Sequence, residues 1–289
     1  MITDSFFEIG DGHEVCEDYA VHGENYGIVS DGCSNGGGPR IDTDWGSRLL
    51  CKAAEDHIEN HGSDWFSSVV CAQAAQQARM YRHVSNRCLL ATLLSLHTYG
   101  GVVSGRVFGD GVLGARDHDG TWSIWSVEFM PGGTLGLAAP YYPYYMVSGE
   151  TEKWAQCFGG SYRILSYSGL LTTLRSVSDS TGNVYLGSTP EMQEEWWFSD
   201  DTCDFAFIAT DGLHSFYRWE ESKTGKQRVP VDFLDVLGVL LDVKSFRPGF
   251  LRTQRRWCFR QDRPGTFKRL GWHHDDDVSM AAVYLGEQD

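Results

Sequence analysis

The sequence has no long apolar run and no recognisable targeting segment. None of its apolar stretches approaches the roughly 18 residues that are needed to span a bilayer. The first residues, MITDSFFEIGDG, lack the basic start and the long apolar stretch of a signal peptide. We therefore expect a soluble, cytoplasmic protein without a membrane partner.

Paired cysteines and an excess of positive charge are also missing. The eight cysteines include no C-x-x-C pair, which argues against a zinc knuckle or a dithiol redox motif, so most should be reduced core residues. Basic residues number 24 against 39 acidic ones, for a net charge of −15. This balance makes nucleic acid an unlikely partner for the surface as a whole, although it leaves room for a local basic patch.

Apolar and aromatic residues are present in the amount that a large core requires. The 289 residues are 42% hydrophobic and 13% aromatic, which suits one large domain or two small ones. No internal repeat, low-complexity tract or linker divides the chain. We therefore predict a single domain over residues 1–289.

The spacing of apolar residues changes several times along the chain. Between residues 89 and 186, short segments rich in β-branched and aromatic residues alternate with glycine, which is typical of an antiparallel sheet. Two predicted helices each begin with an aspartate able to cap. The predicted elements are strands at 5–10, 26–31, 204–212 and 278–286, several short strands from residue 89 onward of which the last is 183–187, and helices at 42–58, 64–84 and 231–243. This order predicts an α+β layered domain with its helices grouped together.

Three apolar segments end with an aspartate beside glycine. YGIVSDG ends at Asp31, RVFGDG at Asp110 and FAFIATDG at Asp211, and the acidic cluster in HHDDDVSMAAVYL precedes the last predicted strand. Any one Asp-Gly pair is most simply a turn. As a set after apolar strands, the carboxylates could converge, and they would repel one another unless Mg²⁺ or Mn²⁺ neutralised them. The set therefore favours a metal site.

The order of these signatures resembles the protein phosphatase 2C family of metal-dependent protein serine/threonine phosphatases. The matching segments are Glu17-Asp18-Tyr19-Ala20, Asp31-Gly32, Gly109-Asp110, Thr210-Asp211-Gly212 and Asp276-Asp277-Val278-Ser279. Together they span nearly the whole chain. The resemblance implies a four-layer αββα sandwich, in which two antiparallel sheets pack face to face between layers of helices.

The resemblance also implies the residues that hold the metal. The implied ligands of two Mg²⁺ or Mn²⁺ ions are Asp31, the carbonyl of Gly32, Asp211 and Asp276, with Asp18 holding a water ligand or touching one ion and Asp110 at the position of a third, weaker ion. A metal-bridged water would then attack phosphoserine or phosphothreonine in a phosphorylated protein substrate, with no protein nucleophile.

Two residues depart from the family pattern. The family usually has histidine after the first D-G, whereas this chain has Cys33 and so resembles a divergent branch in which D-G-C-S occurs. We expect Cys33 to be a packed thiol. The usual phosphate-binding arginine, five residues before Asp18, is His13, which can donate to a phosphate oxygen or act as an acid. An ordinary surface histidine is the alternative. His273 and His274 are further candidate proton donors, with turn residues as the alternative.

Residues 244–269 concentrate basic charge. Nine Lys or Arg against Asp262 give this segment about +8, while the remainder carries about −23. Phe250, Trp257 and Phe259 would suit either a nucleic-acid stacking platform or the buried face of a basic helix. We favour a basic rim that attracts phosphorylated substrates. The run AAPYYPYYM, residues 138–146, is interpreted as core packing with tyrosine hydroxyls at its edge, rather than as a flap.

Two other functions stay open. A pseudophosphatase that only binds a phosphoprotein or partner would explain Cys33 and His13, but retention of every metal carboxylate argues against it, because buried unpaired acids are costly. A two-metal nuclease could use the basic segment to hold a nucleic-acid backbone, but the acidic overall charge disfavours it. The sequence leaves the oligomeric state unspecified.

Overall fold

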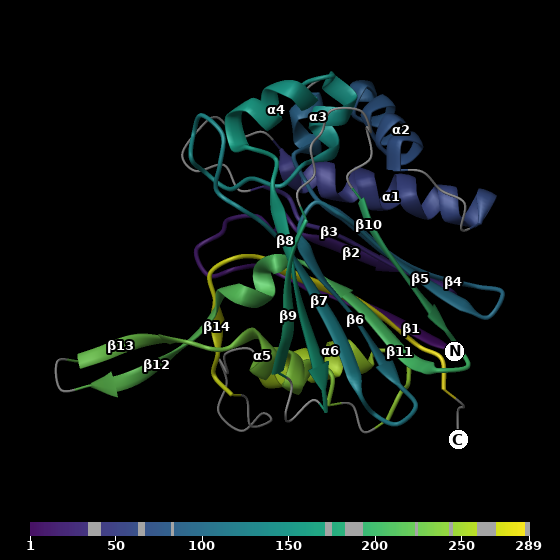
Figure 1. The fold of residues 1–289 in the computed structure, drawn as a ribbon, viewed down its shortest axis with the longest axis vertical. Helices are drawn as coiled ribbons and strands as arrows, with labels where there is room; N and C mark the ends of the chain where they lie inside the picture. The colour runs from purple at the N-terminus through teal and green to yellow at the C-terminus, as the bar shows by residue number, and fades with distance from the viewer. Residues whose placement is uncertain are drawn as a thin grey trace.

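The computed structural model describes residues 1–33, 42–62, 67–81, 84–170, 175–182, 193–222, 225–242, 245–258 and 270–286. Two antiparallel sheets of seven and five strands lie face to face, with helices over the outer face of each sheet (Figure 1). This arrangement confirms the predicted α+β fold with four αββα layers. In the described ranges, no helix combines the length and the apolar character that crossing a bilayer demands.

The strands pair in three sheets. The seven-stranded sheet runs in the order β1 (Ile2–Glu8), β15 (Val278–Tyr284), β11 (Cys203–Ala209), β6 (Gly111–Asp117), β7 (Trp122–Phe129), β8 (Tyr162–Gly169) and β9 (Arg175–Gly182). The five-stranded sheet runs β10 (Gln193–Ser199), β5 (Val102–Phe108), β4 (Leu93–Tyr99), β3 (Tyr26–Ser30) and β2 (Tyr19–His22). A small sheet joins β13 (Gly225–Pro230), β12 (Phe216–Ser222) and β14 (His273–His274).

The helices form the outer layers. They are α1 (Thr43–His61), α2 (Ser67–Met80), α3 (Pro143–Ser148), α4 (Thr151–Phe158), α5 (Phe233–Leu240) and α6 (Phe250–Cys258), with the 3-10 helices η1 (Asn86–Leu89) and η2 (Asp211–Ser215). Helices α1 to α4 lie on the side of the five-stranded sheet, and α5 and α6 lie on the side of the seven-stranded sheet (Figure 1).

The inner faces of the two sheets enclose the first core layer. Val29 of β3, Leu94 of β4 and Ile208 of β11 are fully buried there. Gly27 of β3 lies so close to β15 that a Cβ at this position would be 2.8 Å from the Cβ of Ala281. Small residues at this crossing let the two sheets approach each other closely.

The second core layer packs α5 and α6 against the seven-stranded sheet. Phe250 and Leu251 of α6 are buried, while the half-buried Arg255 of the same helix pairs with Glu8 of β1. The prediction of a buried aromatic face on a basic helix is therefore confirmed for Phe250. The side chain of Trp257, and Phe259 with the rest of the basic segment to residue 269, lie outside the described residues.

Most predicted elements that lie within the described residues are confirmed. Asp42 is at the N-cap of α1 but has a left-handed backbone with φ 54°, and its side chain makes no capping hydrogen bond, so the predicted cap is wrong. Asp64 and the strand predicted at 183–187 lie outside the described residues. The β12–β13 hairpin was not predicted.

Candidate active site

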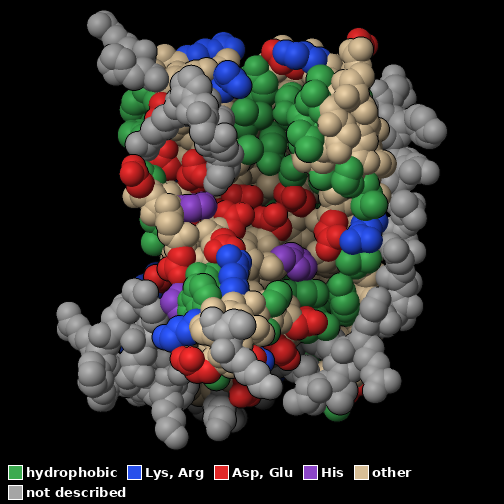
Figure 2. Space-filling model, turned by 90° about the vertical axis from the view of Figure 1, so that its left-hand side faces the viewer, with side chains coloured by type: hydrophobic (Ala, Val, Ile, Leu, Met, Phe, Trp, Pro, Cys, Tyr) green, Lys and Arg blue, Asp and Glu red, His purple; other side chains and the backbone are tan. Residues whose placement is uncertain are grey.

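Three aspartates meet at one end of the sandwich. Asp31 directly follows β3, Asp110 lies between β5 and β6, and Asp211 begins η2 just after β11. Carboxylate oxygens of the three lie within 4.8 Å of one another. Figure 2 looks at this end and shows acidic side chains gathered in a hollow at its centre. The strand ends thus bring together residues that lie far apart in the sequence.

Asp18 and Asp276 complete the acidic cluster. Asp18 precedes β2 and is fully buried, and its Oδ2 accepts a hydrogen bond of 2.8 Å from Oγ1 of Thr210. Asp276 precedes β15 and is partly exposed, and its negative charge contributes to the raised pKa values of Asp31 and Asp211, after burial. The five carboxyl groups predicted from the sequence therefore lie in one neighbourhood.

The pKa of every carboxyl group in this cluster is raised. Burial, aided by the charges of neighbouring aspartates, raises the pKa of Asp18 to about 8 and that of Asp211 to about 6. The same causes raise the pKa of Asp31 and Asp110, and burial raises that of Asp276. Without a counter-charge, the cluster therefore resists full ionisation at neutral pH.

Orphaned oxygens make the cluster suitable for a cation. Oδ1 of Asp18 and Oδ1 of Asp110 are buried without a hydrogen-bond partner within the described part of the chain. Buried polar atoms are normally paired, so such atoms in a cluster call for a ligand. Hard divalent cations with oxygen ligands fit this donor set.

The glycines beside these aspartates serve two different purposes. A Cβ at Gly212 would lie 1.8 Å from the carbonyl oxygen of Asp277, and one at Gly32 would lie 2.8 Å from that of Glu17. Both positions need glycine because another backbone segment passes there, and neither has a positive φ. Asp110, by contrast, sits in a turn between Gly109 and Gly111, whose φ values are 100° and 139°.

Asp277 anchors the N-terminal loop to the start of β15. Its Oδ1 accepts hydrogen bonds from the Gly10 N–H at 2.7 Å and from Nδ1 of His13 at 3.0 Å, and its Oδ2 accepts one from the Glu17 N–H. Asp277 is buried, with an exposed fraction of 2%. His13 is therefore held by a carboxylate beside Asp276, and it is not an unattached surface histidine.

His273 and His274 form β14, so the interpretation of these two residues as a turn is wrong. Nδ1 of His274 lies 2.7 Å from the carbonyl oxygen of Asp276, and its ring stacks on Phe216. Nδ1 of His273 lies 2.7 Å from Oδ2 of Asp11, and its ring stacks on Tyr217. Both rings therefore help to hold the segment that leads to Asp276.

Tyr142 is a site residue that the sequence did not reveal. It precedes α3, it is 7% exposed, and its side chain lies beside the thiol of Cys33. Burial raises its pKa, and so do the charges of Cys33 and of the aspartates, Asp110 and Asp31 among them. The predicted burial of residues 138–146 is confirmed for Tyr141 and Tyr142, but only the tertiary structure shows that this edge faces the acidic cluster.

Solved structures share this architecture over nearly the full length of the chain. A bacterial serine phosphatase, solved as a variant with an arginine replaced by alanine, is 10% identical, with 99% of each chain covered and a TM-score of 0.50. The chain has the protein phosphatase 2C fold.

Other solved structures give lower TM-scores against this chain. PppA of Pseudomonas aeruginosa is 13% identical, with 98% of this chain and 96% of that chain covered and a TM-score of 0.48. The Ser/Thr phosphatase MsPP of Mycobacterium smegmatis, solved with cacodylate, is 14% identical, with 99% of each chain covered and a TM-score of 0.47. No family model and no curated protein sequence matches the chain.

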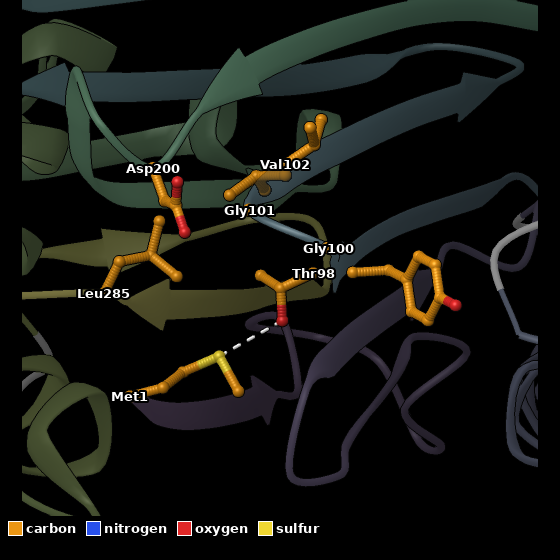
Figure 3. A pocket seen from close by; sticks show the side chains of 9 residues that line it. Met1, Thr98, Gly100, Gly101, Val102, Asp200 and Leu285 are labelled. Atoms are coloured by element: carbon orange, nitrogen blue, oxygen red, sulfur yellow. Dashed lines mark hydrogen bonds between the residues drawn. The ribbon is translucent and has the colours of Figure 1, made fainter.

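A separate hollow of about 250 Å³ lies at the opposite end of the sheets. Figure 3 shows Met1, Thr98, Asp200 and Leu285 among its lining residues. Strand β4 starts beside Asp31 and ends at this hollow, so the length of the strand, roughly 20 Å, separates the two places. The hollow is therefore not part of the acidic site.

Proposed function

We propose that the chain is a metal-dependent phosphomonoester hydrolase that acts on phosphoserine or phosphothreonine in cytoplasmic proteins. The observation that carries the proposal is the convergence of Asp31, Asp110 and Asp211, whose oxygens lie within 4.8 Å of one another. The unpartnered oxygens of Asp18 and Asp110 support it. So does the phosphatase 2C fold.

The metal would be held by this chain's carboxylates. The proposed ligands of two Mg²⁺ or Mn²⁺ ions are Asp31, the carbonyl of Gly32, Asp211, Asp276 and Asp18, with Asp110 for a third ion. When bound, such ions supply Lewis-acid chemistry, because they activate water and offset the charge of a phosphoryl group.

His13 is the proposed proton donor. Its Nδ1 donates to Asp277, which leaves Nε2 free to give a proton to the serine or threonine oxygen as the P–O bond breaks. The carboxylate of Asp277 orients the ring. Cys33 is poorly suited to this task because burial raises the pKa of its thiol. The hydroxyl of Tyr142 is a further donor that faces the cluster.

Phosphate release from an aryl phosphate and from phosphothreonine peptides, with Mn²⁺, Mg²⁺ or a chelator, tests this function. We expect release with the metal and none with the chelator. A chain that binds the phosphopeptide but releases no phosphate would instead be a pseudophosphatase. Cleavage of a phosphodiester or of nucleic acid, with phosphomonoesters untouched, would indicate a nuclease.

A further inference from the structure

The β12–β13 hairpin projects from the end of the sandwich that carries the acidic cluster. In Figure 1 it extends to the left of both sheets, and in Figure 2 it points toward the viewer below the hollow that holds the acidic side chains. Strand β12 begins directly after η2, which starts at Asp211, and β14 is followed by Asp275 and Asp276. A protein that brings a phosphorylated residue to the cluster therefore passes beside the hairpin.

One face of the hairpin carries aromatic and charged side chains. Trp219 is paired with Arg228 across the two strands and Glu221 with Lys226, so these side chains share a face with Tyr217. The guanidinium carbon of Arg228 lies 3.8 Å from the centre of the Tyr217 ring, and Trp219 packs edge-on at 5.9 Å from it. Even so, Trp219 is 50% exposed.

This face is fixed at its base and connected to the site. The hydroxyl of Tyr217 donates to Oδ2 of Asp11 at 3.3 Å, and the ring of His273 stacks on Tyr217 at 5.2 Å. Arg228 pairs with Asp275, the residue before Asp276. The exposed part of the face therefore stands at a defined position next to the acidic cluster.

We propose that this hairpin face binds the polypeptide of the phosphorylated substrate next to its phosphorylated residue. Trp219 would pack against a substrate side chain, and Lys226 would face an acidic group. The inference rests on the proposed function.

Three physical arguments favour this occupant. Tryptophan and arginine dominate the binding energy of many interfaces. A phosphorylated peptide is anionic, so cationic side chains beside the site reduce its repulsion by a chain of net charge −15. Lys226 and Pro230 lie on the edge strand β13, where such residues oppose the addition of another strand, so side chains rather than the strand edge make the contact.

The test compares Trp219→Ala with Trp197→Ala. Trp197 of β10 is 57% exposed and lies outside the hairpin, so it is a matched control. The substrates are a phosphothreonine peptide with acidic flanking residues and an aryl phosphate too small to reach the hairpin. We expect Trp219→Ala to raise KM for the peptide about tenfold and to leave kcat/KM for the aryl phosphate unchanged. Trp197→Ala should change neither value.

The outcomes separate this proposal from the proposed function. An unchanged KM for the peptide in Trp219→Ala overturns the docking face, while aryl phosphate hydrolysis still supports the phosphatase. If wild type hydrolyses neither substrate with Mn²⁺, the proposed function fails. Peptide binding by Trp219→Ala and Trp197→Ala is then measured by fluorescence anisotropy, and equal affinities overturn the docking face too.

A second variant protects the test against misfolding. If Trp219→Ala also loses activity on the aryl phosphate, Lys226→Glu decides, because Lys226 is exposed and its replacement does not threaten the core. Lys226→Glu should then lower kcat/KM for the peptide alone, and the loss should shrink in high salt. Equal effects on the two substrates overturn the proposal.

Discussion

Asp18 and Asp277 are two buried aspartates with opposite surroundings. Oδ1 of Asp18 has no partner among the described residues, and burial is the main cause that raises the pKa of this carboxyl to about 8. Asp277 accepts three hydrogen bonds, from Gly10, His13 and Glu17. Ionised Asp18 therefore costs stability in the metal-free protein, whereas the three hydrogen bonds of Asp277 contribute stability.

The same substitution should act in opposite directions at these two positions. In chelator at pH 8, we expect Asp18→Asn to keep or raise the free energy of unfolding, and Asp277→Asn to lower it by about 1–3 kcal/mol because its amide cannot accept all three bonds. Urea denaturation measures both. Equal destabilisation by the two variants would contradict the different roles assigned to these carboxyl groups.

His13 should matter most for poor leaving groups. Loss of a general acid costs on the order of 10²–10⁴ in rate, and an aryl oxide leaves without much help. We expect His13→Ala to lower kcat/KM far more for a phosphothreonine peptide than for an aryl phosphate, and Cys33→Ser to keep most of the activity on both. An equal fall on both substrates would reduce His13 to a phosphate contact.

At the scale of secondary-structure elements, the sequence predicts those strands and helices whose apolar residues are regularly spaced. Strands β3, β11 and β15 are buried apolar runs, and α1 and α5 carry regular apolar faces, so each was predicted close to its observed place. The hairpin was missed because it packs only at its base. Phe216 and Tyr217 are buried in succession, which breaks the alternation of a strand, and β13 is almost entirely exposed.

The residues of the candidate site also fall into two groups, those that the sequence predicts and those that it does not. The five aspartates could be predicted because each stands beside a strand in a recognisable order. Tyr142 and the anchoring contacts of Asp277 could not, because they depend on where α3 and the N-terminal loop pack in three dimensions. The interpretation of the Asp-Gly pairs as turns holds at Asp110 but is wrong for Gly32 and Gly212, where close backbone contact requires glycine.

The contact between η2 and β15 predicts a strong effect of one methyl group. Gly212→Ala would place a Cβ 1.8 Å from the carbonyl oxygen of Asp277, which cannot move without disturbing the cluster. We expect a loss of about 1–3 kcal/mol or more in stability. At Gly238 of α5 nothing lies within 4 Å of the added Cβ. Gly238→Ala should therefore gain about 0.5–1 kcal/mol. Thermal unfolding compares the two, and a harmless Gly212→Ala would contradict the close packing described.

For the whole molecule, the cluster predicts how the stability of the metal-free protein changes with pH. The pKa of Asp18 rises from an ordinary 3.8 to about 8 on folding, and that of Asp211 rises to about 6, chiefly through burial. A raised acid pKa means that the folded state binds more protons, so stability falls as pH rises from about 4 to about 8.

Thermal unfolding in chelator, between pH 5 and pH 8, measures this dependence. The Tm should fall across the range, and Mn²⁺ should raise it most at high pH because the ligands must be deprotonated to bind the ion. In Asp18→Asn the fall should be smaller. A Tm that stays level or increases with pH in the chelated wild type would contradict the electrostatic account of the cluster.

The sandwich explains why an ordered series of short motifs predicts the fold so well. Each motif is weak alone, but the antiparallel topology returns the ends of β3, β5 and β11 and the start of β15 to one end of the molecule. The single domain over 1–289 stays a prediction. So do the metal number and the roles of the individual ligands.

The central claim is that this acidic cluster makes a metal-dependent phosphatase. The most direct test is phosphate release from a phosphothreonine peptide as Mn²⁺ is increased, for wild type and for Asp211→Asn, which removes a charge with little change in volume. The account predicts saturable, chelator-sensitive release by wild type, and a folded variant that needs at least about tenfold more Mn²⁺ or stays inactive. Equal release by both proteins at every Mn²⁺ concentration, or release by wild type in chelator, would contradict it.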